Sequence, residues 1–422
     1  MMGATSTSGA RPHTCPGGAM TEPPVAPLAV PIGAAAYRAR RERVAALARA
    51  AGADVSVWWA NHRVSYLSGF AFVPTERPIA LVIAVDGETV LFVPRLELEH
   101  AQAYAHVDRV EAYPEFPGER HPMHVLADLL RSLGLRARLA GDGEGYPKVM
   151  GYTGPRVTDL TDATFTALDD ELERMMQVKG DDEIALIRES ARWAGRAHRL
   201  LQDLTRPGLS ETEVEQAVTA QATKELLDAY QGTYRAFTWG LAGPWATYRG
   251  QVGPHSAFPH ALNVNAVFAP GDTLVTGATC PMFGYWSELE RSMVLGEPSA
   301  EQRTWFAHML ALQDLAIDAC RPGRTCSSVD RAVRAYVERH GIGHTWRHHV
   351  GHNIGLRYHE GPFLDVGDDT VMEVGMLFTV EPGVYVPGLG GFRHSDTILV
   401  SASGPEFLTD YPRELDDLVI PA

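Results

Sequence analysis

The segment RPGLSETEV at residues 206–214 is the strongest indication of the fold, because it returns as RPGRTCSSV at residues 321–329, 115 residues further on. The two copies share Arg-Pro-Gly, a hydroxyl side chain two residues later and a set of small apolar positions downstream. Pro-Gly ends a helical pattern, and a Ser or Thr that follows it is a typical N-cap. In the first copy, Ser210 and Glu213 form a capping box. The repeat predicts two similar halves in tandem, related by a pseudo-twofold axis and sharing a curved sheet, with the site between them.

The segments around the repeat support this organisation. Residues 168–230 have an almost continuous helical pattern that breaks at Pro207-Gly208. A strand-rich block follows each helical pair, at residues 272–294 and at residues 376–400. In the second block, Pro-Gly-Leu-Gly-Gly at residues 387–391 joins two apolar runs and predicts a hairpin connection.

A smaller domain is expected ahead of the repeat. Residues 37–53 have helical spacing, and a β-like run follows at residues 55–59. Asp86-Gly87 joins two apolar runs, at residues 79–85 and 89–93, as a hairpin does. Further helical patterns cover residues 96–104 and 123–133. We therefore divide the chain into a disordered tail (1–36), a small α/β domain (37–165) and a catalytic domain (166–422). Met20 is a candidate for the true start, because the residues before it have no periodicity.

Composition excludes several classes of function. The formal net charge of -15 disfavours phosphate backbones and anionic lipid surfaces, so neither nucleic acid nor a membrane is an expected partner. The apolar run near residues 28–36 is interrupted by Pro31 and matches neither a signal peptide nor a membrane span. Four cysteines are too few for a disulfide framework in a chain of 422 residues, which favours a cytoplasmic location.

Three motifs of the second domain carry a resemblance. They are GYWSELER at residues 284–291, Gly351-His352-Asn353-Ile354-Gly355, and Glu381-Pro382-Gly383. The chain resembles the creatinase, prolidase and aminopeptidase P family. This implies a two-domain α+β protein, with a small α/β N-terminal domain of the creatinase type and a C-terminal pita-bread domain with internal pseudo-twofold symmetry.

In this family, an Asp, a second Asp eleven residues on, a His and two Glu hold two metal ions that activate a water. Here Glu288, His352 and Glu381 align with three of these ligands. Gly277 stands at the first Asp and Ser395 at the last Glu. A two-metal clamp without its bridging carboxylate is incomplete, so we expect no metal and no cofactor.

Creatinase works without metal, and the resemblance to it extends to residues 289–292 and to residues 76–81 of the first domain. It implies that Glu290 and Glu381 grip a cationic amidine or guanidine group. By the same resemblance, His260 is the expected proton-transferring base. Arg77 is expected to reach across a homodimer interface and bind a carboxylate of the substrate. The remaining candidate site residues are His352 in a catalytic role and Glu288, His348 and His359 in substrate binding. Cys280 is expected to be a small buried apolar residue, because no basic partner stands beside it.

One imidazole can serve as base and then as acid, because its ordinary pKa of about 6.5 lies near working pH. Our main hypothesis is therefore a metal-independent hydrolase of a carbon–nitrogen bond in a small amidine, guanidine or cyclic amidine, creatine-like or ectoine-like. The first alternative is an aminopeptidase P- or prolidase-like metallopeptidase with an altered ligand set, favoured by the three histidines and by Glu-Gly-Pro at residues 360–362. The second alternative is a non-catalytic binding protein on the same fold. The segment Trp239–Arg249, with Trp245 and Tyr248, is expected to line a pocket of its own shape.

Overall fold

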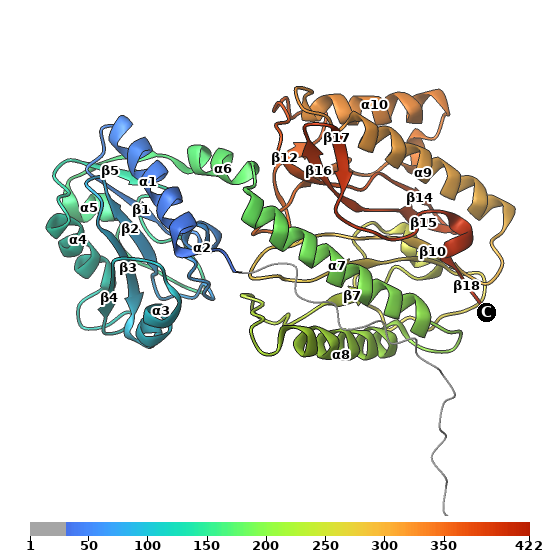
Figure 1. The fold of residues 1–422 in the computed structure, drawn as a ribbon, viewed down its shortest axis with the longest axis horizontal. Helices are drawn as coiled ribbons and strands as arrows, with labels where there is room; N and C mark the ends of the chain where they lie inside the picture. Colours follow the sequence, from blue (N-terminus) through green and yellow to red (C-terminus); the bar gives the residue numbers. More distant parts are fainter. Residues whose placement is uncertain (1–30) are drawn as a thin grey trace, which may run out of the picture.

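The computed structural model describes residues 31–422 and has two domains side by side, joined by one helix (Figure 1). The predictions of a disordered tail and of a start at Met20 lie almost entirely outside the described residues. Within them, residues 34–36 belong to the first helix, so this end of the predicted tail is wrong. Alanines here continue the helical pattern of the residues that follow, because alanine has the highest helix propensity.

The first domain is built on a six-stranded sheet with the order β4-β3-β2-β1-β5-β6. The predicted hairpin at Asp86-Gly87 is present, with β2 and β3 antiparallel. The strands are β1 (Val55–Trp58), β2 (Ala80–Ala84), β3 (Thr89–Pro94), β4 (Arg109–Tyr113), β5 (Arg138–Gly141) and β6 (Thr164–Ala167). The boundary at residues 165 and 166 stays a prediction.

Helices cover both faces of this sheet. Alternate residues of a strand point to opposite faces, and β2 accordingly places Leu81 in one hydrophobic core and Val82 in the other. The helices are α1 (Ala34–Ala50), α2 (Asn61–Ser68), α3 (Leu98–Tyr104), α4 (Pro122–Ser132) and α5 (Val157–Thr161).

The helical region predicted for residues 168–230 forms three helices rather than two. They are α6 (Asp169–Gln177), α7 (Asp181–Leu204) and α8 (Glu211–Tyr230). The extra break falls at Val178–Gly180, where Lys179 N donates to Gly375 O at 3.0 Å. Ser210 caps α8, and its side chain and that of Glu213 form the predicted capping box.

The two copies of the repeat occupy equivalent positions. Gly208 N donates to Phe268 O at 2.9 Å, and Gly323 N donates to Met372 O at 2.9 Å. The N-cap residues Ser210 and Thr325 each form an isolated antiparallel bridge to a valine. The second copy begins α10 (Cys326–Arg339), which follows α9 (Ala300–Ala319). The internal repeat read from the sequence is therefore present as two matching helix starts.

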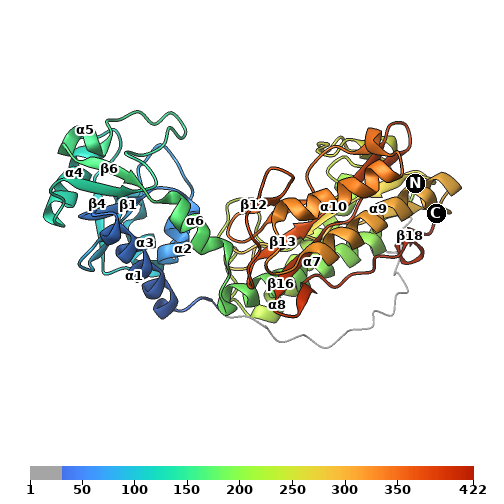
Figure 2. The ribbon, with the colours of Figure 1, turned by 90° about the horizontal axis from the view of Figure 1, so that it is seen from above.

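The strands of the second domain lie between these helix pairs (Figures 1 and 2). The largest sheet has the order β12-β11-β13-β16-β17. The predicted hairpin at residues 387–391 joins β14 and β15. The strands are β7 (Trp245–Thr247), β8 (Thr273–Val275), β9 (Gly277–Thr279), β10 (Ser292–Leu295), β11 (Gly351–Asn353), β12 (Glu360–Leu364), β13 (Leu377–Val380), β14 (Gly383–Val386), β15 (Gly390–Arg393), β16 (Asp396–Ser401), β17 (Gly404–Phe407) and β18 (Val419–Ile420).

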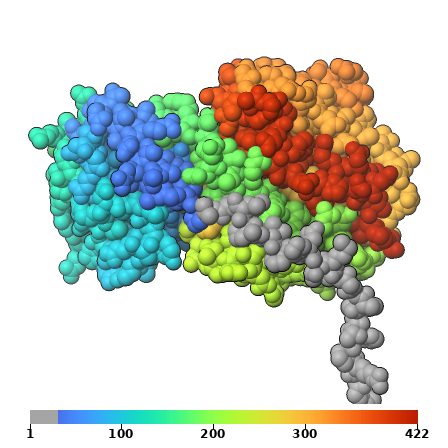
Figure 3. Space-filling model, in the orientation of Figure 1, coloured from blue at the N-terminus to red at the C-terminus, as the bar shows by residue number. Residues whose placement is uncertain are grey.

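Charged groups fasten the two domains to each other. Glu173 on α6 accepts hydrogen bonds from Arg63 of the first domain and from Arg357 of the second. Arg40 on α1 lies 3.3 Å from Glu183 on α7. The space-filling view shows the residues coloured green between the blue first domain and the red C-terminal segment (Figure 3). No helix among the described residues is long and apolar enough to cross a membrane.

Candidate active site

The second domain brings the aligned residues together at the ends of its strands. Glu288 and Glu290 lie between β9 and β10, His352 lies on β11, and Glu381 follows β13. The backbones of Glu290 and Ser395 form an antiparallel bridge, and Glu381 N donates to Val350 O at 2.7 Å. These backbone hydrogen bonds keep the segments that carry the four side chains close together.

His352 is fully buried and is oriented by its backbone. Its Nδ1 donates to Asn353 O at 3.0 Å, which leaves Nε2 as the nitrogen that faces the acidic residues. Nε2 lies 3.3 Å from Glu381 Oε1 but has no aligned hydrogen-bond partner among the described residues. A buried ring nitrogen in this state is free to act as a ligand or to exchange a proton.

The charges of this cluster influence one another. Burial raises the pKa of Glu288 to about 7, and the nearby charges of Glu381 and Glu290 act in the same direction. Burial favours the neutral form of His352, but Glu381 and Glu288 outweigh it and raise the pKa of His352 to about 9. The pKa of Glu381 is lowered, because contact with His352 outweighs the opposing effect of burial. Without a further cation, Glu288 therefore takes up a proton near neutral pH.

Gly277 faces a guanidinium where the family has its first Asp. A Cβ atom at residue 277 would lie 3.5 Å from Arg249 Cζ. Arg249 forms an ion pair with Glu290, whose carboxylate also pairs with Arg393. Both oxygens of Glu290 therefore accept hydrogen bonds from the chain itself. Two guanidinium groups of the protein already pair with Glu290, and its expected grip on a cationic amidine or guanidine stays a prediction.

Ser395 stands at the position of the family's last Glu. Its hydroxyl donates to Glu288 Oε1 at 2.6 Å, and the Glu288 main chain pairs with Thr397 Oγ1. A serine here cannot bridge two ions, but it orients the Glu288 carboxylate.

The residues fit one metal ion and do not fit two. A two-ion set lacks the carboxylates at residues 277 and 395, and Arg249 places a positive charge beside the first of these. Ligand atoms of Glu288, His352 and His359 lie within 4.8 Å of one another. Glu288, Glu290 and Glu381 meet the same distance condition, but the arginines already use Glu290. Two imidazoles and one carboxylate form a ligand set that suits zinc, iron or manganese.

The three other predicted histidines lie in this cluster or beside it. His359 stacks on His352 with ring centroids 3.8 Å apart, and partial desolvation together with the charge of His352 lowers its pKa to about 4. His260 is exposed, and its charge adds to the lowering at His359. Both nitrogens of His348 are engaged, Nδ1 with His349 O and Nε2 with the Tyr385 hydroxyl. Their roles in catalysis and binding stay predictions.

Arg77 lies apart from the cluster in this chain. Its side chain pairs with Glu76 and Glu115, both in the first domain. A role at the site would need a second copy of the chain, as the prediction states. Cys280 is buried, and burial raises the pKa of its thiol, which agrees with the expectation of an apolar core residue.

Sequence reasoning missed Arg249, Arg393 and Tyr385. The segment Trp239–Arg249 is expected to line a pocket, and Trp239 does line a cavity, whereas Tyr248 is buried in the core and Trp245 donates to Glu215 Oε1 at 2.8 Å. The sequence signal at Arg249 is the glycine that follows it; in the structure both residues have positive φ angles, 51° and 76°.

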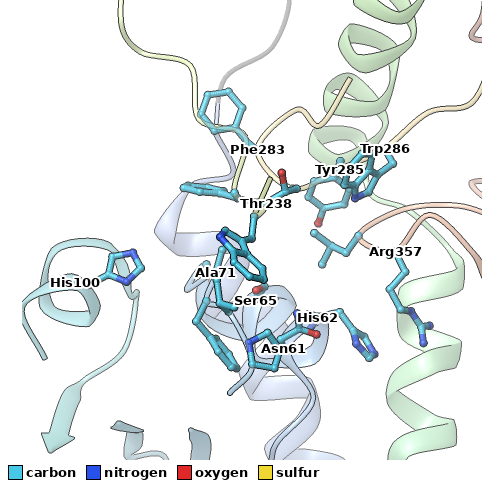
Figure 4. Close-up of a pocket in the computed structure, with 18 of the residues that line it drawn as sticks. Asn61, His62, Ser65, Ala71, His100, Thr238, Phe283, Tyr285, Trp286 and Arg357 are labelled. Carbon is cyan, nitrogen blue, oxygen red and sulfur yellow. The ribbon is translucent and has the colours of Figure 1, made fainter. Parts of the chain in front are cut away.

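A cavity of about 520 Å³ lies between the domains (Figure 4). Its lining includes Trp239, Trp286, Phe283, His62 and Arg357. The catalytic cluster does not line it, but Trp286 is two residues from Glu288 and packs edge-on against Tyr358, the neighbour of His359. The cavity therefore adjoins the cluster through one aromatic pair.

Known proteins share this architecture. Residues 185–402 match metallopeptidase family M24, and residues 40–189 match the creatinase/prolidase N-terminal domain. A putative dipeptidase, YkvY of Bacillus subtilis, is 26% identical over 380 residues, which covers 89% of this chain and 99% of that protein. An uncharacterized peptidase of Staphylococcus aureus is 27% identical over 357 residues, 83% of this chain and 93% of that protein.

Two solved structures are similar to this chain over most of its length. The Xaa-Pro dipeptidase from Bacillus anthracis has a TM-score of 0.76 and 26% identity, and covers 92% of this chain and 100% of its own. Dipeptidase PepE from Mycobacterium ulcerans has a TM-score of 0.76 and 25% identity, and covers 93% of this chain and 100% of its own.

The fold, the paired domains and the ligand-like cluster thus define a hydrolase of carbon–nitrogen bonds with the creatinase, prolidase and aminopeptidase P architecture. The chain belongs to metallopeptidase family M24. The main hypothesis of a metal-independent amidine or guanidine hydrolase is wrong, because the full-length relatives are called dipeptidases and peptidases. The first alternative, a peptidase with an altered ligand set, agrees better with these findings.

Proposed function

We propose that this protein hydrolyses a peptide bond in short peptides, Xaa-Pro dipeptides among them, at the cluster of Glu288, His352, His359 and Glu381. The observation that carries the proposal is the buried Nε2 of His352, which has no aligned hydrogen-bond partner in the described part of the chain and faces the carboxylates of Glu288 and Glu381. The names of the relatives, dipeptidase and Xaa-Pro dipeptidase, support the substrate class.

Glu288, His352 and His359 would hold a single ion. When bound, such an ion polarises the peptide carbonyl and lowers the pKa of a water. Asn353 O fixes the His352 tautomer that leaves Nε2 as the ligand atom, and Ser395 orients Glu288.

Glu381 is suited to move the proton. Its side chain is 14% exposed, whereas that of Glu290 is 2% exposed. A glutamate side chain has an ordinary pKa of about 4.5, so it is ionised at neutral pH and can accept a proton from the attacking water at a carboxylate oxygen. The same oxygen then protonates the departing nitrogen of the substrate.

Hydrolysis of a dipeptide panel that contains Ala-Pro tests this proposal. Wild type should release the free amino acids, and His352→Ala and Glu288→Gln should each lower kcat/KM by about 100-fold or more, as loss of a principal catalytic group does. His124→Ala, which removes an exposed histidine of the first domain, should leave the rate unchanged. Absence of release from every peptide, or full activity of His352→Ala, would refute the proposal.

We also propose a cytoplasmic homodimer. Cys280, Cys320 and Cys326 are free and buried, as suits a reducing compartment. Light scattering of the purified chain should give twice the monomer mass, and Arg77→Ala should lower activity without changing that mass. A monomer of full activity would contradict the dimer.

A further inference from the structure

The loop that carries Arg249 brings a second guanidinium group to Glu290. Arg249 Nη2 bonds the Glu290 carboxylate and lies 3.3 Å from Gln251 Oε1, and Arg393 Nη2 lies 3.3 Å from the same oxygen. Two guanidinium groups therefore share one carboxylate, and the carboxylates of Glu288 and Glu381 each have an oxygen within 4.8 Å of a Glu290 oxygen. An arginine of such a group that keeps free donors can pair with an anionic ligand.

The two arginines differ in how far solvent reaches them. The Arg393 side chain is 3% exposed, and its remaining amino group donates to Pro259 O and to the Tyr385 hydroxyl. The Arg249 side chain is 30% exposed, and its Nε and Nη1 donors have no partner among the described residues. Arg249 is thus the member of the pair that can receive a ligand.

Gly277 leaves room beside this guanidinium. A Cβ atom at residue 277 would lie 3.6 Å from both Nε and Nη2 of Arg249, which is ordinary contact distance. Any larger side chain would extend from that contact along the guanidinium. The glycine therefore leaves Nε of Arg249 uncovered by the strand that passes it, whereas Nη2 already bonds Glu290 and Gln251.

We infer that Arg249 anchors a carboxylate of the substrate in the space left by Gly277. This rests on the proposed peptide hydrolysis and adds a specificity-determining residue to it. The carboxylate accepts from an Arg249 donor that no described residue uses. It comes either from the C terminus of the peptide or from an acidic side chain, and the chemistry at Arg249 is the same for both.

Two matched ligand pairs distinguish these sources. Ala-Pro and its C-terminal amide differ only in the terminal carboxylate, and Glu-Pro and Gln-Pro differ only in the side-chain carboxylate. Calorimetric titration of wild type should give about 10- to 100-fold tighter binding of the acid in one of the pairs, as for a hydrogen bond to a charged group.

Two substitutions should remove this preference by different routes. Arg249→Gln removes the cation, and Gly277→Asp places a carboxylate of the chain beside Arg249 to compete with the ligand. Each should bring the ratio of the two dissociation constants close to one. Arg331→Gln, which removes an exposed arginine of α10, should keep the wild-type ratio. If Arg249 only held Glu290 in place, Arg249→Gln would weaken the acid and the neutral ligand equally.

Thermal unfolding checks that the variants fold, and Gly277→Asp keeps the test available if Arg249→Gln does not. A ratio near one for both pairs in wild type, or an unchanged ratio in Arg249→Gln, overturns the anchor. Hydrolysis of the same peptides is followed in parallel. Carboxylate-dependent binding without hydrolysis would support the anchor at Arg249 and refute the proposed peptide hydrolysis. Hydrolysis with equal binding of the acid and the neutral ligand would support the peptide hydrolysis and refute the anchor.

Discussion

Replacing Glu173 by Gln should loosen the junction between the domains and change how stability depends on pH. Burial disfavours the Glu173 carboxylate, but hydrogen bonds from His62 and Arg63 and the charge of Arg357 outweigh it and lower its pKa to about 2. The ordinary value is 4.5. A shift of this size corresponds to about 3 kcal/mol of stability, at about 1.4 kcal/mol for each pH unit.

The sign of the pH dependence follows from the lowered pKa. A carboxylate that is more acidic in the folded state contributes its full stability above the unfolded pKa and loses it as pH falls toward the folded pKa. Urea unfolding of wild type and Glu173→Gln should therefore differ by about 3 kcal/mol at pH 7 and by about 1.5 kcal/mol at pH 3.

Glu171→Gln is the matched control, because Glu171 lies on the same helix and pairs with Arg174 at 3.1 Å on the surface. It should cost less than about 0.5 kcal/mol, as exposed ion pairs do. A difference between wild type and Glu173→Gln that is below about 1 kcal/mol at pH 7, or that does not shrink at pH 3, would refute the reasoning.

Two substitutions inside the second domain have equally definite outcomes. Gly351→Ala would place a Cβ atom 2.0 Å from Thr379 O, so it should push β11 from β13, lower the free energy of unfolding by at least about 2 kcal/mol and reduce hydrolysis. Tyr385→Phe removes the hydroxyl that lies 2.7 Å from His348 Nε2 and should cost about 1–2 kcal/mol in urea unfolding, because it leaves buried polar groups without a partner.

Each of these has a neutral counterpart in the chain. Gly33→Ala meets no atom within 4 Å and, because Gly33 is the N-cap of α1, should cost no more than about 1 kcal/mol. Tyr336→Phe removes a half-buried hydroxyl that contacts His308 on the surface and should cost less than about 0.5 kcal/mol. Equal losses in a substitution and its counterpart would contradict the packing described for β11 or the hydrogen bond described for Tyr385.

The architecture could be read from the sequence because it depends on local signals. The repeated Pro-Gly and hydroxyl caps, the Asp86-Gly87 turn and the apolar periodicity each act over a few residues. The motifs around Glu288, His352 and Glu381 likewise identified positions that the fold brings together.

The chemistry could not be read in the same way, because it depends on partners far apart in the chain. Glu290 was expected to face a substrate cation, but Arg249 is 41 residues away and Arg393 is 103 residues away in sequence. No local pattern indicates that two arginines converge on one carboxylate. The glycine at residue 277, where the family has its first Asp, could be seen in the sequence. Its effect depends on the Arg249 guanidinium that lies beside it.

The most direct test of the central claim is a titration of metal-free protein with manganese, zinc or iron, with bound metal and Ala-Pro hydrolysis measured on the same samples. If Glu288, His352 and His359 form the single site, hydrolysis should rise in step with binding and reach its plateau at one ion per chain. A plateau at two ions per chain, or hydrolysis that does not follow bound metal, would contradict it.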